Sequence, residues 1–292
     1  MSETTPGFLP RAARTRWEDL LVEAEAALPP VEAHRILEQV SGLSRSEMVV
    51  GLGDPVPERV IPYFREKVAR RAAGEPLQYV LGSWAFRSLD LMVDQRVLIP
   101  RPETEFVVEE GIRALKACPD AEAPVLVDLG TGSGAIGLSL AVEIPTAEVW
   151  ATDRSSEALD VARANLIGIG TFAATRVRLV EGSWYGALPQ VIRGRVAMII
   201  SNPPYVADGE DLPEEVGYWE PASALRAGPD GLDDVRVIVD GAPHWLVDGG
   251  ALVVEIAPSQ AGSVVDLARA AGFGSADVKP DLTGRPRVLV AR

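Results

Sequence analysis

The sequence predicts an α/β protein: a small helical N-terminal domain and a β-hairpin linker, then a mainly parallel sheet that ends in an antiparallel hairpin. Helical periodicity dominates the first quarter of the chain. From Val125 onward, strand-like and helix-like segments alternate, which is typical of a parallel sheet with helices on both faces. The last two strands, 276–278 and 287–291, are joined by a turn too short for a parallel crossover, so they should pair antiparallel.

Four amphipathic segments predict the helical domain, which we place at residues 1–76. Pro29 and Pro30 should end the first helix, because proline lacks a backbone donor. Ser44 and Glu47 have the spacing of a capping box and should start the third helix. The predicted helices cover 12–28, 31–40, a short segment from 44, and 57–73.

Residues 77–100 are predicted to form the linker. Residues 79–81 and 84–93 are rich in aromatic and β-branched residues and flank a Gly-Ser pair, which predicts a β-hairpin. Two prolines then bracket Arg101, and this arrangement predicts an extended segment before the next helix.

Residues 101–292 are predicted to hold the sheet, whose buried strands appear as short apolar runs. The predicted strands before the final hairpin are 125–129, 148–152, 177–181, 196–201 and 251–256. The predicted helices are 103–116, 135–143, 156–168, 232–246 and 259–271.

The composition excludes several classes of protein. One Cys in 292 residues excludes a disulfide framework and a Cys-based metal site, and two His are too few for a typical zinc site. No apolar run approaches the ~20 residues of a membrane span. The N-terminus lacks the basic region and apolar core of a signal peptide. We therefore expect a cytoplasmic protein with no metal and no membrane association.

The net charge of −14 argues against a direct nucleic-acid partner, because nucleic-acid affinity comes largely from Lys and Arg on phosphates. Residues 1–86 carry 10 basic and 12 acidic side chains, whereas residues 87–292 carry 18 and 30. The excess of negative charge therefore lies in the part that holds the predicted sheet.

A break after one predicted strand carries the most specific chemistry. The strand 196–201 runs directly into Asn202-Pro203-Pro204-Tyr205. The two prolines cannot continue a strand, so the turn is stiff, and ligands of open α/β sheets bind at the carboxyl ends of strands. The turn offers an amide, backbone carbonyls and an aromatic ring, but no acid, base or thiol. It is suited to holding a planar amide or amine.

A glycine-rich loop, Gly130-Thr-Gly-Ser-Gly134, follows the strand 125–129 and lets the backbone approach a ligand closely. The next strand ends at Asp153, whose carboxylate can accept hydrogen bonds from both hydroxyls of a ribose. Loop and carboxylate together predict a nucleoside-containing cofactor, and they leave NAD and S-adenosylmethionine both open.

Three features favour S-adenosylmethionine. Asp128 supplies an additional acid just before the loop, the sheet ends in an antiparallel hairpin, and the Asn-Pro-Pro-Tyr turn follows the fourth strand. A nicotinamide-dependent oxidoreductase, the alternative from another class, would explain the glycine loop but neither the turn nor the hairpin.

With these motifs the sequence resembles the class I S-adenosylmethionine-dependent methyltransferases, and more closely the bacterial release factor glutamine N5-methyltransferases. The most specific shared segments are Gly74-Glu-Pro-Leu-Gln-Tyr79, Leu98-Ile-Pro-Arg-Pro-Glu-Thr-Glu105, Asp128-Leu-Gly-Thr-Gly-Ser-Gly134, Ser201-Asn-Pro-Pro-Tyr205, and Glu220-Pro221 leading to Asp230-Gly-Leu232. The sequence departs from the family at Gly137, where Ala is usual, and at Ala227, where Gly is usual. The resemblance implies a Rossmann-like class I methyltransferase sheet.

The resemblance also implies an activity: methyl transfer from S-adenosylmethionine to the side-chain amide nitrogen (N5) of the glutamine in the Gly-Gly-Gln loop of class 1 peptide chain release factors. The partner would be this protein substrate, with no direct nucleic-acid contact and no membrane. We expect a monomer. Its helical domain fits a platform that recognises the substrate, and a structural scaffold is the alternative.

The residues that match the family's motifs take roles from the resemblance. The implied cofactor site consists of Gly130, Thr131, Gly132, Ser133, Gly134, Asp153, Trp184 and Asn202. Within it, the loop would cradle the methionine part, Asp153 would hold the ribose, and Trp184 would lie against the adenine; core packing is the alternative for Trp184. The implied substrate site consists of Asn202, Pro203, Pro204 and Tyr205, with catalytic roles for Asn202, Pro203 and Tyr205.

Other substrates and roles stay open on the sequence alone. A glutamine methyltransferase acting on a ribosomal protein, an adenine N6-methyltransferase acting on nucleic acid, and a non-catalytic binding protein share parts of the pattern. Glu103 and Glu105 fit either ordinary first-turn helix acids or residues lining a substrate channel, and Arg101 fits a structural ion pair. The acidic segment 208–220 fits a solvated loop or a lid.

Overall fold

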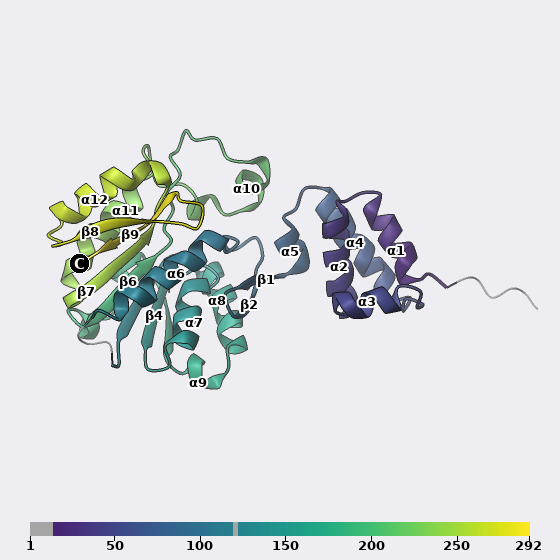
Figure 1. Cartoon of the computed structure of the whole chain (residues 1–292), viewed down its shortest axis with the longest axis horizontal. Helices are drawn as coiled ribbons and strands as arrows, with labels where there is room; N and C mark the ends of the chain where they lie inside the picture. The colour runs from purple at the N-terminus through teal and green to yellow at the C-terminus, as the bar shows by residue number, and fades with distance from the viewer. Residues whose placement is uncertain (1–13, 119–121) are drawn as a thin grey trace, which may run out of the picture. The chain divides into compact units, whose positions relative to one another are not determined.

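The computed structural model describes residues 14–118 and 122–292, and its contacts divide the chain into two compact units (Figure 1). The first unit ends at Leu81 and is helical; the second begins at Gly82 and holds the sheet. Across the described ranges, every helix is too short or too polar to cross a membrane.

The described part of the first unit consists of helices that pack around a small apolar core. Ser44 starts the third helix as predicted: the Glu47 backbone N–H donates to Ser44 Oγ at 3.4 Å, and the Ser44 N–H donates to the Glu47 carboxylate at 2.8 Å. Leu20, Ile36 and Phe64 are fully buried between the helices. The helices are α1 (Trp17–Glu25), α2 (Pro30–Ser41), α3 (Arg45–Gly51), α4 (Val60–Ala72) and α5 (Leu77–Leu81).

The expected hairpin is present, but its first predicted strand is wrong. Residues 79–81 belong to helix α5, whose first turn is closed by backbone bonds from Tyr79 and Val80 to the Pro76 carbonyl. Three consecutive side chains of α5 are buried, which suits a short packed helix and not an alternating strand. The hairpin lies just after it, between β1 (Ser83–Phe86) and β2 (Leu89–Met92).

A seven-stranded sheet forms the centre of the second unit, in the order β5-β4-β3-β6-β7-β9-β8. All pairings are parallel except those of β9, which runs antiparallel to both of its neighbours. The predicted terminal hairpin is therefore confirmed. The strands are β3 (Val125–Leu129), β4 (Glu148–Asp153), β5 (Val177–Glu181), β6 (Val196–Ser201), β7 (Leu246–Glu255), β8 (Ala276–Pro280) and β9 (Pro286–Ala291).

Helices cover both faces of this sheet (Figure 1). Apolar residues of α6 and α7 pack with Leu126, Met198 and Ile200 on one face, whereas α11 and α12 pack with Val127 and Ile199 on the other. The short helices α9 and α10 were not predicted, because each is about one turn long and lacks an amphipathic period. The helices are α6 (Pro102–Leu115), α7 (Ala135–Glu143), α8 (Ser156–Gly168), α9 (Thr171–Ala174), α10 (Glu214–Trp219), α11 (Asp233–Gly241) and α12 (Ala261–Ala270).

The strand order reverses between β3 and β6. From β3 the chain builds outward through β4 and β5, and then it returns to add β6 on the other side of β3. At such a switch point the connecting loops leave in opposite directions and open a crevice beyond the carboxyl ends of the strands. The glycine loop after β3 and the Asn-Pro-Pro-Tyr turn after β6 border this crevice.

The close packing of α6 on β6 gives a test of the fold. Gly111→Ala should lower the free energy of unfolding by about 1–3 kcal/mol. A Cβ at Gly111 would lie 2.9 Å from Ile200 Cδ1 and 3.1 Å from Met198 Sδ, so the core has no room for it. Urea-induced unfolding measures the loss. Gly262→Ala on α12 is the control, since a Cβ there would meet nothing within 4 Å; equal losses in both variants would contradict the packing.

Candidate active site

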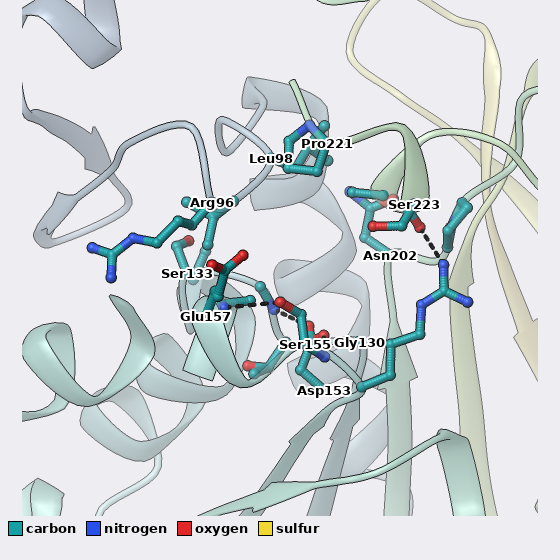
Figure 2. Close-up of a pocket in the computed structure, with 18 of the residues that line it drawn as sticks. Arg96, Leu98, Gly130, Ser133, Asp153, Ser155, Glu157, Asn202, Pro221 and Ser223 are labelled. Atoms are coloured by element: carbon teal, nitrogen blue, oxygen red, sulfur yellow. Dashed lines mark hydrogen bonds between the residues drawn. The ribbon is translucent and has the colours of Figure 1, made fainter. Parts of the chain in front are cut away.

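A cavity of about 220 Å³ lies at the carboxyl ends of the central strands (Figure 2). The carboxyl ends of β3, β4, β5 and β6, with the loops that follow them, contribute Gly130, Asp153, Trp184 and Asn202 to its wall. The segment 95–100, which leads from the hairpin to α6, lines it as well. The lining thus combines a glycine backbone, a carboxylate, an aromatic ring and an amide, a mixture typical of small-molecule sites.

The glycine loop takes a backbone shape that other residues adopt with strain. Gly130, Gly132 and Gly134 have φ values of 73°, 55° and 89°, in the left-handed region that favours glycine. The Gly130 and Thr131 N–H groups both donate to the Thr152 carbonyl, at 2.9 and 2.8 Å, which ties the loop to the end of β4. A Cβ at Gly132 would meet nothing within 4 Å, so this side of the loop is open to a ligand.

Asp153 is held in place by two backbone donors. Its Oδ2 accepts from the Gly132 N–H and its Oδ1 from the Ser155 N–H, both at 2.9 Å. A carboxylate has about four acceptor positions, so these two bonds leave capacity for further donors such as ribose hydroxyls. Figure 2 shows Asp153 beside Gly130 and Ser155, at the end of β4.

Trp184 borders both the cavity and the apolar core. It lines the cavity, and a Cβ placed at Gly130 would come within 3.3 Å of its ring. The same side chain packs against the apolar core on the α11 and α12 face of the sheet. Trp184 also has a φ of 44°, unusual for a residue with a side chain, so its backbone is strained where it meets the site.

The turn after β6 carries the half-buried side chain of Asn202. Every residue of β6 is buried, and two prolines follow Asn202 directly. Asn202 Nδ2 donates to Thr104 Oγ1 at 3.2 Å. Within the described parts of the chain, Asn202 Oδ1 is buried and has no hydrogen-bond partner. A buried acceptor without a donor costs roughly 1–3 kcal/mol, so a ligand donor at this atom would be stabilised.

Most of the predicted site residues lie together. The cavity wall includes Gly130, Thr131, Gly132, Ser133, Asp153, Trp184, Asn202 and Pro204. Gly134 caps the start of α7 and is not part of the wall. Pro203 and Tyr205 are also absent from it: Pro203 is buried, and burial raises the pKa of the Tyr205 hydroxyl far above its usual range.

Arg101 forms the ion pair that was considered for it. Its guanidinium contacts the buried Glu220 carboxylate, which also accepts a bond from the Ile99 N–H at 3.2 Å. Burial raises the pKa of Glu220, with Arg101 acting in the opposite direction. The ion pair joins the segment before α6 to the end of the 206–220 loop, and so it explains the Glu-Pro motif.

Gly231 explains the Asp-Gly-Leu motif. A Cβ at this position would lie 2.3 Å from the Tyr205 carbonyl oxygen, and its φ is 71°. Gln260 Nε2 donates to both the Tyr205 and the Gly231 carbonyls, at 3.1 and 3.0 Å. The two loops are therefore held in direct backbone contact behind the Asn-Pro-Pro-Tyr turn.

Sequence reasoning missed Thr104 and Glu255, the residues that anchor Asn202. Thr104 lies in a segment noted for its glutamates, and Glu255 is the acid at the end of the apolar strand β7. Burial raises the pKa of Glu255 to about 7, while hydrogen bonding from Thr104 and the charge of Arg287 act to lower it. An acid directly after the buried apolar run 251–254 was the local indication of its role.

Asp128 is a second buried carboxyl beside the site. Its Oδ2 accepts from Thr131 Oγ1 at 2.5 Å and from the Gly137 N–H at 2.9 Å. Burial raises its pKa from 3.8 to about 7, and the nearby Asp153 contributes in the same direction. A Cβ at Gly137 would lie 3.0 Å from Asp128 Oδ2, which gives a steric reason for glycine at this departure from the family.

Two family models and several relatives of the same name match this chain over most of its length. The family model described as PrmC N-terminal domain matches residues 12–82, and that described as Methyltransferase small domain matches residues 108–216. The "Release factor glutamine methyltransferase" of Deinococcus radiodurans is 40% identical over 283 residues, covering 94% of this chain and 97% of the relative. The proteins of the same name from Moorella thermoacetica (41%, covering 90% and 91%) and Bordetella pertussis (40%, covering 94% and 98%) are similar to the same extent.

Solved structures show the same fold at low identity. The hMettl16 catalytic domain in complex with MAT2A 3′UTR hairpin 1 has a TM-score of 0.55 and 17% identity, and the match covers 77% of this chain and 80% of that one. At this identity the likeness concerns the fold of the methyltransferase sheet alone.

The buried Asp128 predicts a pH-dependent stability. Its carboxyl is protonated in the fold up to about pH 7 but only up to about 3.8 when unfolded, so its contribution declines as pH rises between these values. The stability of the wild type relative to Asp128→Asn should therefore fall by up to roughly 1.4 kcal/mol per pH unit from pH 4 to 7. Urea unfolding of both proteins across this range measures the difference.

Asp281 supplies the control of opposite sign. A hydrogen bond from Thr283 lowers the pKa of Asp281, so its stabilisation is lost only as pH falls below about 3.8. Asp281→Asn should therefore leave the pH dependence between 5 and 8 unaltered. Parallel curves for wild type and Asp128→Asn would contradict the buried, protonated Asp128.

Proposed function

Because the chain belongs to the family of release factor glutamine methyltransferases, we propose that it transfers a methyl group from S-adenosylmethionine to the side-chain amide nitrogen (N5) of the glutamine in the Gly-Gly-Gln loop of class 1 release factors. The observation that carries the proposal is Asn202 Oδ1, a buried acceptor with no donor among the described residues, on a residue that lines the cavity. A primary amide supplies the donor that this atom lacks.

Two features of the cavity, at Gly132 and at Asp153, fit S-adenosylmethionine. The open side of Gly132 leaves room for a ligand to contact the loop backbone, and the acceptor positions left on Asp153 suit ribose hydroxyls. We assign the Gly130–Gly134 loop to the methionine part, Asp153 to the ribose, and the Trp184 ring to the adenine. When bound, S-adenosylmethionine supplies an electrophilic methyl group on a positively charged sulfur.

The chain's own contribution to the reaction is positioning. An amide nitrogen is a weak nucleophile, because its lone pair is delocalised into the carbonyl. In our proposal Asn202 Oδ1 and the Pro203 carbonyl accept hydrogen bonds from the two N–H groups of the substrate amide. These bonds orient the nitrogen and favour its pyramidal form. Tyr205 packs against the plane of the amide. None of these groups is a strong base, and none is needed, because the nitrogen loses its proton readily once it carries the methyl group.

The helical domain, residues 1–76, is proposed to recognise the release factor, with 77–100 as a linker and 101–292 as the catalytic domain. The match to the family's N-terminal domain over residues 12–82 supports this division. We further propose that the enzyme is a cytoplasmic monomer without direct nucleic-acid contacts, as suits a protein substrate of the translation apparatus. Light scattering of the purified chain tests the oligomeric state.

Mass spectrometry tests the reaction, the substrate and the site together. A purified class 1 release factor incubated with this protein and S-adenosylmethionine should gain one methyl group on the glutamine of its Gly-Gly-Gln loop. Ribosomal proteins and nucleic acid are assayed in parallel, and methylation of those instead would move the activity to the alternative substrates. No transfer together with no cofactor binding by calorimetry would overturn the proposed cofactor as well.

Asn202→Ala should reduce kcat by roughly 10²–10³-fold, the usual cost of removing one preorganised hydrogen-bonding group from an active site. The Kd for S-adenosylmethionine, measured by calorimetry, should change much less, because the loop and Asp153 remain. Gln190→Ala, which removes an exposed amide elsewhere on the catalytic unit, is the control and should keep wild-type turnover. Unchanged turnover in Asn202→Ala would contradict the acceptor role.

The proposed recognition role predicts a separate effect on substrate binding. Val49 and Val50 on α3 are 73% and 88% exposed, an apolar pair available to a partner. Replacing both by Ser should raise the KM for the release factor several-fold and leave the cofactor Kd unaltered. Kinetics with intact release factor and with a short Gly-Gly-Gln peptide separate the two contributions, since only the intact protein should respond.

A further inference from the structure

A chain of three side chains ends at the Asn202 amide. Asn202 Nδ2 donates to Thr104 Oγ1 at 3.2 Å, and Thr104 Oγ1 donates to Glu255 Oε2 at 2.8 Å. Thr104 and Glu255 are 3% and 1% exposed. They come from the first turn of α6 and the last residue of β7, so the chain joins two elements to the turn after β6.

The chemistry of these groups fixes the direction in which hydrogen bonds are donated, from Asn202 to Thr104 to Glu255. An ionised carboxylate can only accept, and a hydroxyl has a single proton to donate. When Thr104 donates that proton to Glu255, its oxygen can only accept from Asn202. The amide must then turn its NH₂ toward Thr104 and its Oδ1 away from it.

We propose, resting on the function proposed above, that Thr104 and Glu255 are positioning residues that hold Asn202 Oδ1 toward the amide nitrogen of the substrate glutamine. Thr104 lines the cavity but is almost fully buried, and neither side chain needs to touch the substrate. They act through Asn202, whose Oδ1 is left as a buried acceptor with no donor among the described residues. If the Asn202 amide were flipped, its NH₂ group would face the NH₂ group of the substrate amide. Two donors would then oppose each other, and no hydrogen bond would form.

The orientation of the Asn202 amide should depend on pH, because it depends on whether Glu255 is ionised. Burial raises its pKa to about 7; Thr104, Arg287 on β9 and Tyr205 after β6 favour the ionised form, and Glu103 on α6 opposes it. A protonated Glu255 can itself donate to Thr104, and then the Thr104 proton is free to turn toward Asn202. Below about pH 7, the amide orientation is therefore no longer enforced, and kcat of the wild type should fall.

Two variants of Thr104 separate positioning from packing. Thr104→Val keeps the shape and loses the hydroxyl, whereas Thr104→Ser keeps the hydroxyl and loses the methyl group. Positioning predicts that Val lowers kcat about 10- to 100-fold and that Ser retains most of it, with the Kd for S-adenosylmethionine unaltered in both. A role in packing alone predicts the reverse order, and that result would overturn the proposal.

Glu255→Gln tests the direction of hydrogen-bond donation from Asn202 through Thr104 to Glu255. A Gln amide can donate as well as accept, so the variant should have lower turnover above pH 7. It should also lack the decline in kcat between pH 8 and 6 that we expect for the wild type. A variant with the wild-type pH profile would overturn the role of Glu255.

NMR gives a readout that does not depend on turnover. The side-chain NH₂ protons of Asn202, assigned by their absence in Asn202→Ala, should exchange slowly with solvent in the wild type and in Thr104→Ser. They should exchange at least ten times faster in Thr104→Val. Equal exchange in all three proteins would overturn the positioning proposal, whereas a wild type that holds the amide but transfers no methyl group would overturn the proposed function instead.

Discussion

The burial of the Asn202 amide oxygen is the constraint on which the rest of the site depends. Strand β6 is buried along its whole length, and the two prolines after Asn202 supply no backbone donors. The polar atoms of the amide must therefore find partners on other segments. Thr104 accepts a hydrogen bond from the nitrogen, and the oxygen has no donor among the described residues, so the amide ligand that we propose would remove a cost of the free protein.

Segments far apart in the sequence meet around this turn. Arg101 pairs with Glu220 on one side, and Gln260 joins the Tyr205 and Gly231 carbonyls on the other. Two of the motifs shared with the family are joined directly to the turn: Thr104 accepts from Asn202, and Gln260 bonds the carbonyls of both Tyr205 and Gly231. Their common physical role is to keep one short, strand-breaking turn rigid, and rigidity is what a catalyst that works by positioning requires.

Buried carboxyls give the site its electrostatic character. Asp128 lies under the glycine loop and Glu255 lies behind the turn, and burial raises the pKa of each to about 7. Both carboxyls are largely neutral below about pH 7 and add to the negative charge at the cavity only as pH rises above it, in a part of the chain that already carries an excess of acids. A cationic cofactor is favoured there, and the absence of a strong base among the groups of the turn agrees with a methyl donor that is already activated.

The sequence by itself determined the main helices and strands of the sheet and their order, the antiparallel end of the sheet, the glycine loop, Asp153 and the Asn-Pro-Pro-Tyr turn. These features follow from local periodicity and backbone sterics, which act within a few residues. Only the tertiary structure decided that residues 77–81 are helical and that Asn202 meets Thr104, 98 residues away, with Glu255 behind it. Those contacts depend on the strand order, which brings the end of β7 beside the end of β6, and no local pattern encodes that neighbourhood.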